Sequence, residues 1–487
     1  MSTATRLEGW LARQSEEPLR WFVATAILLA VQISPWWLPT PDSAAYLSIA
    51  RSIATDHALR MFGYRHSAYP PGYPLLISPA FWLGPEPFLA ISMLQFLIAL
   101  ILMWGLYRWL AEQTAEGALF LTLLVMVNVT LWTYYHRPLS ELAFVTTALW
   151  AVVTLDRALD RATARGRTCL LLIGAALLVL LALIREAGVL FAFALGATLV
   201  LRVRHRTLRT AIALAASAIV LLPAVAAVIG FVIYTQVTFA TTHVFGTHLS
   251  GLFNNPVPLA RRLSNGLRLQ IDGIGRLLVP GMFKAYGYGW VDVNTLIYSV
   301  ICIPLAIGWY RWIVRRPDPY ALVVPLYLLL YVIWDFAADT RYVLPLLPPL
   351  VVALWYFVEP FRRHRLTMIA VLTGLHLVIA MSYWLALELP QAHECARQRQ
   401  LIHQLAPAAA GHAGPIVATK QVPECTRLFL ALTLDRPVAV VRPNLSAIGP
   451  ARVLLTTAGD QRVDGFHIVR TAGDYILWLA DAPTAAR

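Results

Sequence analysis

An aspartate and a tyrosine, Asp42 and Tyr46, directly follow the first long apolar run of this 487-residue chain. They are four residues apart, so on a helix both side chains share one face. A carboxylate and a phenol that face one cavity suit a general base beside a contact for a phosphate or a sugar. Alternatively Asp42, which follows Pro41, only caps the next helix, a common use of aspartate. The residues alone leave both interpretations open.

Three arginines at the ends of apolar runs are candidate partners for a phosphate. Arg185 lies in a short hairpin between two runs, Arg341 begins another, and Arg137 shortly precedes Glu141. Arginine binds phosphate oxygens through two parallel hydrogen bonds. Each could instead form a structural ion pair, as charges near membranes often do. The possible pairs are Arg185 with Glu186, Arg341 with Asp339 or Asp335, and Arg137 with Glu141.

Two further residues, Glu141 and His66, have open roles. Glu141 is either a second cavity carboxylate or only the partner of Arg137. His66 lies shortly before the turn Tyr69-Pro70-Pro71-Gly72-Tyr73 and could contact a phosphate or a metal. An isolated histidine in a loop is more often simply solvated.

The composition indicates a membrane protein. Hydrophobic residues make up 59% of the chain and charged residues 13%, whereas soluble proteins carry about 25% charged residues. The net charge of +13 does not indicate nucleic-acid binding, because the arginines cluster in short loops between apolar runs. There they orient helices and meet anionic lipid headgroups.

Apolar runs long enough to span a bilayer predict a mainly α, polytopic protein with eleven transmembrane helices. Basic loops alternate with loops that are nearly free of arginine, so the positive-inside rule places the N-terminus in the cytoplasm and the C-terminus outside. The first run lacks a cleavage site and is expected to be retained. The predicted spans are 20–39, 88–107, 117–134, 139–155, 169–184, 187–202, 211–234, 295–312, 320–337, 343–358 and 366–386.

Three segments are expected outside the membrane on the same face. Segments 40–87 and 235–294 belong to the transmembrane domain, 1–389, and contain amphipathic stretches at 43–58 and 259–274 that predict helices lying along the interface. Segment 390–487 predicts a small α/β domain. Its expected helices cover 391–405 and 425–433, and its expected strands 416–419, 438–441, 453–456, 466–470 and 475–479.

Two of the four cysteines, Cys395 and Cys425, lie in this C-terminal domain. A disulfide between them is plausible in an oxidising compartment, but the sequence does not show whether they are close. Cys169 and Cys302 lie in or at membrane helices, where a free thiol is ordinary packing.

Together the motifs resemble those of membrane glycosyltransferases of the GT-C fold. They are Asp42-x-x-x-Tyr46, Tyr69-Pro70-Pro71-Gly72-Tyr73 and Arg341-Tyr342-x-x-Pro345-x-x-Pro348, in that order over residues 20–360. The chain is most similar to the bacterial branch with protein O-mannosyltransferases and lipid A aminoarabinose transferases.

The resemblance implies transfer of a sugar from a polyprenyl-phosphate donor to an envelope lipid, glycan or protein at the outer face of the bacterial inner membrane. It favours Asp42 as a catalytic base over a bare cap, and Glu141 matches an acidic position often seen in the family. The expected site therefore has Asp42 and Glu141 as catalytic carboxylates. Substrate contacts are expected from Tyr46, His66, Tyr69, Arg137, Arg185, Arg341 and Tyr342.

One departure concerns a metal. The aminoarabinose transferases carry Glu-Lys-Pro where this chain has Tyr69-Pro70-Pro71, and that glutamate helps to bind a metal ion. A divalent metal therefore stays possible but unassigned, and the donor sugar is open.

Two other functions remain as alternatives: a lipid or oligosaccharide transporter, and a metal-independent polysaccharide ligase or polymerase. Transporters tend to carry charged or broken helices near the bilayer midplane. The predicted spans are nearly free of charge and the polar candidates gather at one face, which favours chemistry at the surface.

The predicted topology can be tested with single cysteines at Arg165, expected inside, and Thr471, expected outside. An impermeant thiol reagent added to intact cells should label only position 471. Labelling at 165 would contradict eleven spans, because only that number keeps the basic loops on one side.

Overall fold

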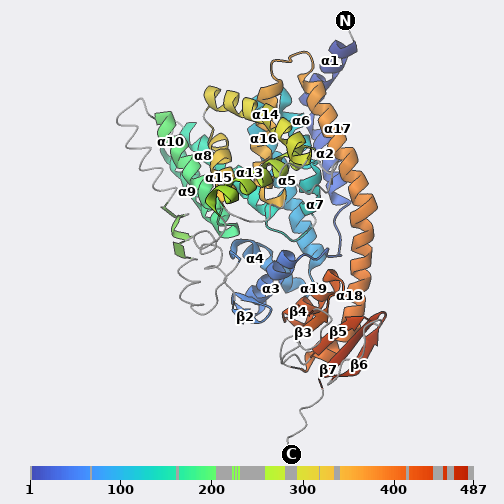
Figure 1. Ribbon diagram of the computed structural model, residues 1–487. Helices are drawn as coiled ribbons and strands as arrows, with labels where there is room; N and C mark the ends of the chain where they lie inside the picture. The colour runs from blue at the N-terminus through green and yellow to red at the C-terminus, as the bar shows by residue number, and fades with distance from the viewer. Residues whose placement is uncertain are drawn as a thin grey trace, which may run out of the picture.

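The computed structural model shows a long helical bundle with a small sheet at its C-terminal end (Figure 1). The structure describes residues 3–65, 69–135, 137–160, 164–203, 222–223, 225–227, 229–230, 258–279, 293–316, 318–333, 340–412, 416–441, 453–457 and 466–480. Three of the described helices, at 88–114, 295–315 and 365–410, are long and apolar enough to cross a membrane. The chain therefore has the helices of an integral membrane protein.

The helices follow the predicted apolar runs closely. Every predicted span except 211–234, most of which lies outside the described residues, coincides with a helix or a pair of helices, and the total of eleven stays a prediction. These helices are α2 (Pro18–Ala30), α5 (Phe88–Thr114), α6 (Ala118–Met126), α7 (Val129–Tyr135), α8 (Glu141–Asp160), α9 (Ala164–Ile184), α10 (Gly188–Val203), α14 (Val293–Arg315), α15 (Pro319–Ile333), α16 (Leu347–Val358) and α17 (Arg365–Tyr383); α1 (Thr3–Glu16) precedes them.

Two spans differ from their predicted form. The first ends at Ala30 rather than near 39, since Pro35 has no amide hydrogen and disfavours helix in the residue before it. The third is bent by 53° between α6 and α7. The cause is Asn128, whose side-chain Oδ1 accepts a hydrogen bond from the Thr130 amide at 3.0 Å and so caps α7.

Helix α3 (Pro41–Asp56), which was expected to lie along the membrane interface, has most of its residues buried against protein. It packs against α4 (Gly72–Ile77), the short hairpin of β1 (Arg60–Met61) and β2 (Tyr64–Arg65), and α19 (Glu424–Leu434) of the C-terminal domain. Its start is fixed by a capping box: Thr40 Oγ1 accepts from the Ser43 amide, and Ser43 Oγ accepts from the Thr40 amide at 2.8 Å. Thr40, not Asp42, is therefore the N-cap.

The second helix expected at the interface, α13 (Leu259–Leu278), covers the predicted stretch 259–274 and packs closely on neighbouring helices. Gly266 lies so near the α15 backbone at Val332 that an added Cβ would overlap it, and Gly275 lies against the ring of Tyr298 on α14. Like α3, α13 thus has a face that is buried against other helices of the protein.

The C-terminal domain confirms the predicted helices and strands. Its sheet has the order β4-β3-β5-β7-β6, with β3 parallel to both β4 and β5, while β7 is antiparallel to β5 and β6. The strands are β3 (Ile416–Thr419), β4 (Val438–Val441), β5 (Val453–Thr457), β6 (Phe466–Ala472) and β7 (Tyr475–Ala480).

No break in the helix marks the predicted domain boundary at 389/390. Helix α17 continues through one π-helical turn, Trp384–Glu388, into α18 (Leu389–Ala410). Figure 1 shows this continuous helix running along the bundle to the sheet.

Close packing of α14 on α16 predicts a steric effect at Gly308. A Cβ there would collide with the Ala353 carbonyl oxygen, so Gly308→Ala should destabilise the protein by about 1–3 kcal/mol, although alanine favours a helix. Thermal unfolding in detergent measures this. The control is Gly374→Ala on α17, where nothing lies within 4 Å of the added Cβ; equal stability of the two variants would contradict the packing.

Candidate active site

The candidate site lies at the end of the helical bundle nearest the C-terminal domain, where segments far apart in sequence meet (Figure 1). Asp42 comes from the first turn of α3 and Glu141 begins α8. Arg185 lies between α9 and α10, and Arg341 and Tyr342 belong to the 3-10 turn η3 (Thr340–Tyr342). The structure therefore brings together most of the residues that the sequence singles out.

Asp42 uses both carboxylate oxygens. The Tyr69 hydroxyl donates to Oδ1 at 2.6 Å, and Arg341 Nη1 forms an ion pair with Oδ2. Arg341 thus pairs with a carboxylate about 300 positions away rather than only with aspartates close in sequence; Asp335 and Asp339 lie outside the described residues. Because Thr40 caps α3, the carboxylate of Asp42 is available for contacts across the site.

The charge on each partner of Asp42 is set by its surroundings. Burial, then the nearby carboxylate of Asp42, raises the pKa of Tyr69, so its phenol keeps its proton. Burial acts to lower the pKa of Arg341, but the carboxylates of Asp42 and Glu141 and the hydroxyl of Tyr342 together outweigh it and raise the pKa, so the guanidinium stays charged. The site thus contains a fixed cation beside Asp42.

A second ion pair joins Arg185 to Glu141, with Arg185 Nη1 donating to Glu141 Oε1 at 2.9 Å. Glu141 is 2% exposed. Its Oε2 is buried and has no hydrogen-bond partner among the described residues. Arg185 thus pairs with Glu141 rather than with its sequence neighbour Glu186. Glu141 correspondingly pairs with Arg185 rather than with Arg137.

The ring of Tyr342 joins the two arginines. The guanidinium carbons of Arg341 and Arg185 lie 4.9 and 5.3 Å from its centroid, and Arg341 Nη2 donates to its hydroxyl at 3.0 Å. Such cation–π contacts fix the planes of the guanidinium groups. One ring thus holds two cations in a single locus, and each cation is paired with its own carboxylate, Asp42 or Glu141.

Buried tyrosines form the wall behind this locus. The Tyr46 hydroxyl lies 3.2 Å from Ser140 Oγ, and its ring meets those of Tyr69 and Tyr73 edge-on, each at 5.1 Å between centroids. On the other side Tyr331 packs against Tyr342 at 5.5 Å. Sequence reasoning missed Ser140, which immediately precedes Glu141, and Tyr331, for which the sequence gives no signal.

One predicted residue, Arg137, is not in this cluster. The Arg137 side chain pairs with Glu388 of the π-helical turn at 3.3 Å rather than with Glu141. Its carbonyl oxygen accepts from Gln95 Nε2 at 2.8 Å, and Gln95 also donates to the Tyr73 hydroxyl. Arg137 therefore supports the tyrosine wall from outside. His66 lies outside the described residues.

The described residues do not fit a divalent metal at Asp42. Both of its oxygens are taken by Tyr69 and Arg341, and Tyr69 supplies a protonated phenol at the position where the resemblance leads one to look for a carboxylate. No group of three His, Cys, Asp or Glu side chains suited to a metal occurs among the residues that the structure describes. The cation facing Asp42 is a guanidinium.

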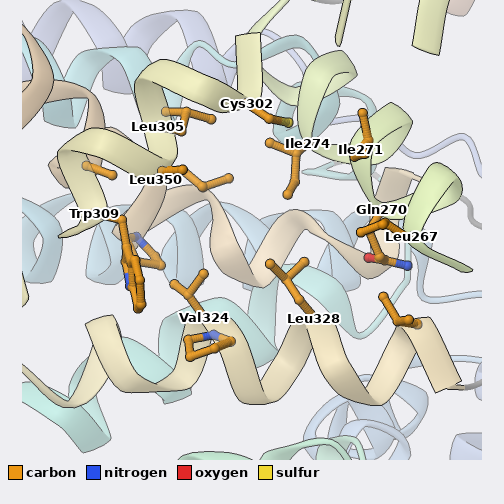
Figure 2. A pocket seen from close by; sticks show the side chains of 15 residues that line it. Leu267, Gln270, Ile271, Ile274, Cys302, Leu305, Trp309, Val324, Leu328 and Leu350 are labelled. Carbon is orange, nitrogen blue, oxygen red and sulfur yellow. The ribbon is translucent and has the colours of Figure 1, made fainter. Parts of the chain in front are cut away.

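An apolar cavity of about 260 Å³ lies between α13, α14, α15 and α16 (Figure 2). Its lining is almost entirely hydrocarbon and includes Ile274, Leu328 and Leu350. Helix α15 connects it to the site, since Leu328 and Val332 line the cavity while Tyr331 packs on Tyr342. Helix α13 also contacts η3. Helices α13 and α15 thus take part both in the cavity and in the surroundings of the site.

No protein-family model and no curated protein sequence matches the chain. Its fold nevertheless matches those of solved GT-C glycosyltransferases, so the chain has the GT-C fold. The predicted resemblance is confirmed at the level of fold.

The similar structures include ArnT from Cupriavidus metallidurans bound to undecaprenyl phosphate, at 14% identity and a TM-score of 0.58 over 96% of this chain and 98% of that one. The apo form of that protein gives a TM-score of 0.55 at 14% identity, over 94% and 97% of the two chains. The Archaeoglobus fulgidus oligosaccharyltransferase in complex with Zn and sulfate gives 0.55 at 11% identity, over 90% of this chain and 68% of that one.

The buried pair of Glu141 and Arg185 predicts non-additive stability. Arg185→Met leaves a buried carboxylate without its cation, which costs about 3–5 kcal/mol. Adding Glu141→Gln removes that charge, so the double variant should unfold at a higher temperature than Arg185→Met alone. Thermal unfolding of both single variants and the double variant measures the coupling. Simple additivity would show that the two groups do not interact.

Proposed function

We propose that the chain is a membrane glycosyltransferase that moves a sugar from a polyprenyl-phosphate donor to a hydroxyl of an envelope lipid, glycan or protein. The observation that carries this proposal is the convergence of Asp42, Arg341 and Arg185 from distant segments. A carboxylate beside two fixed cations suits a base next to a leaving phosphate. The GT-C fold supports the assignment.

In the proposed reaction Asp42 accepts the proton of the acceptor hydroxyl. The hydroxyl oxygen forms a bond to the anomeric carbon of the donor sugar, and the bond from that carbon to the phosphate oxygen breaks. Tyr69 holds one carboxylate oxygen at 2.6 Å, which leaves Oδ2, now paired with Arg341, as the oxygen that takes the proton. The entering donor phosphate supplies Arg341 with an alternative anion, so the proton acceptor is freed when the donor binds.

The leaving polyprenyl phosphate gains negative charge as the glycosidic bond breaks. Arg341 and Arg185, which share the Tyr342 ring, are placed to stabilise that charge without moving far. Cations that are already in position stabilise a transition state without a cost for reorganisation. Glu141 keeps Arg185 oriented through its ion pair. We assign Glu141 a positioning role rather than that of a second base.

The isoprenoid units nearest the donor phosphate are assigned to the apolar cavity between α13 and α16, because its lining offers hydrocarbon contacts and almost no polar partner. Undecaprenyl phosphate bound to ArnT, a structure of the same fold, supports a lipid-linked donor. By the predicted topology, transfer takes place at the outer face of the inner membrane.

The base assignment predicts that Asp42→Asn abolishes most transfer. The amide keeps the size of the side chain but cannot take the proton, and losing a general base costs on the order of 10²–10⁴ in rate. Since Thr40 caps α3, folding should be little affected. Transfer from a polyprenyl-phosphate sugar is measured on monodisperse protein.

The matched control for this experiment is Asp56→Asn, the same exchange in the last turn of α3, where the carboxylate is exposed. It should retain normal turnover. Near-normal turnover by Asp42→Asn would refute the base role. Export of a lipid-linked sugar without transfer, in reconstituted vesicles, would favour the transporter.

The phosphate assignment predicts that Arg341→Ala weakens donor binding more than acceptor binding. Removing the guanidinium deletes a bidentate phosphate contact, so KM for the donor should rise at least tenfold. Arg397→Ala, which removes an exposed arginine of α18 paired with Glu394, is the control. An unchanged KM for the donor, with loss of stability alone, would make Arg341 a purely structural partner of Asp42.

A further inference from the structure

Two cysteines of the C-terminal region face each other across a helix interface. Cys395 is on α18 and 2% exposed, and Cys425 is the second residue of α19 and half-buried. The two helices pack together, both thiols are free in this structure, and each thiol is near enough to shift the pKa of the other. About 30 residues of chain, including β3, separate them. The fold thus answers the question of proximity that the sequence left open.

Polar contacts beside the cysteines fix how α19 sits on α18. The hydroxyl of Thr426, next to Cys425, donates to Gln398 Oε1 at 3.0 Å, and Gln398 is one turn beyond Cys395. The Tyr475 hydroxyl of β7 lies 3.4 Å from the same threonine. These buried contacts hold the two sulfur atoms in register.

The other end of α19 holds the helix that carries Asp42. Asp435, which ends α19 in a left-handed conformation, accepts a hydrogen bond from Ser48 of α3 at 3.1 Å. Arg51 of α3 donates to the Leu432 carbonyl oxygen at 2.7 Å. The amide of Phe62, in the β1–β2 hairpin, donates to Ser48 Oγ at 2.6 Å. Helix α19 therefore bridges α18 and α3.

We propose that Cys395 and Cys425 form a disulfide bond that fastens α19 to α18 and thereby steadies α3 and the position of Asp42. The bond is a covalent modification site at the interface between the transmembrane helix α17–α18 and the C-terminal domain. A bond that closes a loop of about 30 residues also lowers the conformational entropy of the unfolded chain and so stabilises the folded protein.

The chemistry is thiol–disulfide exchange. The Cys425 thiolate attacks a disulfide of an oxidising partner, protein or small molecule, and forms a mixed disulfide while one partner thiol leaves. The Cys395 thiolate then attacks the Cys425 sulfur and releases the second partner thiol, so two protein thiols are oxidised and one disulfide is reduced.

The environment favours Cys425 as the attacking group. The neighbouring Cys395 thiol lowers the pKa of the Cys425 thiol, and a lower pKa raises the thiolate fraction. Cys425 is also the more exposed of the pair. The proposal rests on the predicted topology, which places this domain on the oxidising side, and not on the transferase assignment.

Thiol trapping tests the bond. Cells that express the full chain are quenched with acid and N-ethylmaleimide, and the purified protein is digested and mapped without reduction. The expected result is one cross-linked pair of peptides, containing 395 and 425, with Cys169 and Cys302 alkylated as internal controls. Alkylation of both Cys395 and Cys425, or either one bonded to another thiol, would overturn the proposal.

Reduction tests the link to α3. Dithiothreitol should lower the Tm of the wild-type protein to that of Cys425→Ser and leave that variant unchanged. Hydrogen exchange should become faster in 424–435 and 41–56 on reduction, with 88–114 unaffected as a control. Equal effects of dithiothreitol on both proteins, or unchanged exchange in 41–56, would overturn the role of the bond in holding α3.

Discussion

The need to pair charges in a poorly hydrated environment determines how this end of the molecule is built. A carboxylate that loses its cation in such surroundings costs several kcal/mol. The structure meets this constraint twice, with Asp42 against Arg341 and Glu141 against Arg185. Each pair joins elements far apart along the chain, so the helices can approach only in the arrangement that brings the charges together. The ring of Tyr342, between the two guanidinium groups, couples the pairs into one unit.

Around this unit, the residues that fix the helices differ from the residues proposed to react. Thr40 and Ser43 start α3, which frees Asp42 for contacts across the site. Arg137 and Glu388 secure the π-helical turn from behind. The apolar cavity is lined almost entirely by hydrocarbon, and two of its helices, α13 and α15, also contribute to the surroundings of the site. In the proposed reaction Arg341 exchanges the Asp42 carboxylate for the donor phosphate, and this exchange frees Asp42 to take the proton of the acceptor.

The sequence predicted the elements far better than their partners. Short strand-like runs located the strands of the C-terminal sheet, and apolar length located the helices, because both signals are local. Partners of Arg341 were sought at Asp335 and Asp339, close in sequence, whereas the structure pairs it with Asp42, and no local pattern encodes such a contact. The bend at Asn128 and the burial of α3 were missed for the same reason: both arise from tertiary contacts. Proximity of Cys395 to Cys425 likewise depends on the packing of α18 on α19.

The uninterrupted helix formed by α17, the π-helical turn and α18 has a mechanical consequence. Its 46 residues extend about 70 Å at 1.5 Å per residue, more than twice the roughly 30 Å hydrocarbon thickness of a bilayer. The helix is therefore long enough for its apolar part to cross a bilayer while the rest extends into the C-terminal domain. A change in bilayer thickness that altered the tilt of the apolar part would therefore also move the part in the C-terminal domain, and with it α19, which packs on α18, and α3, which packs on α19.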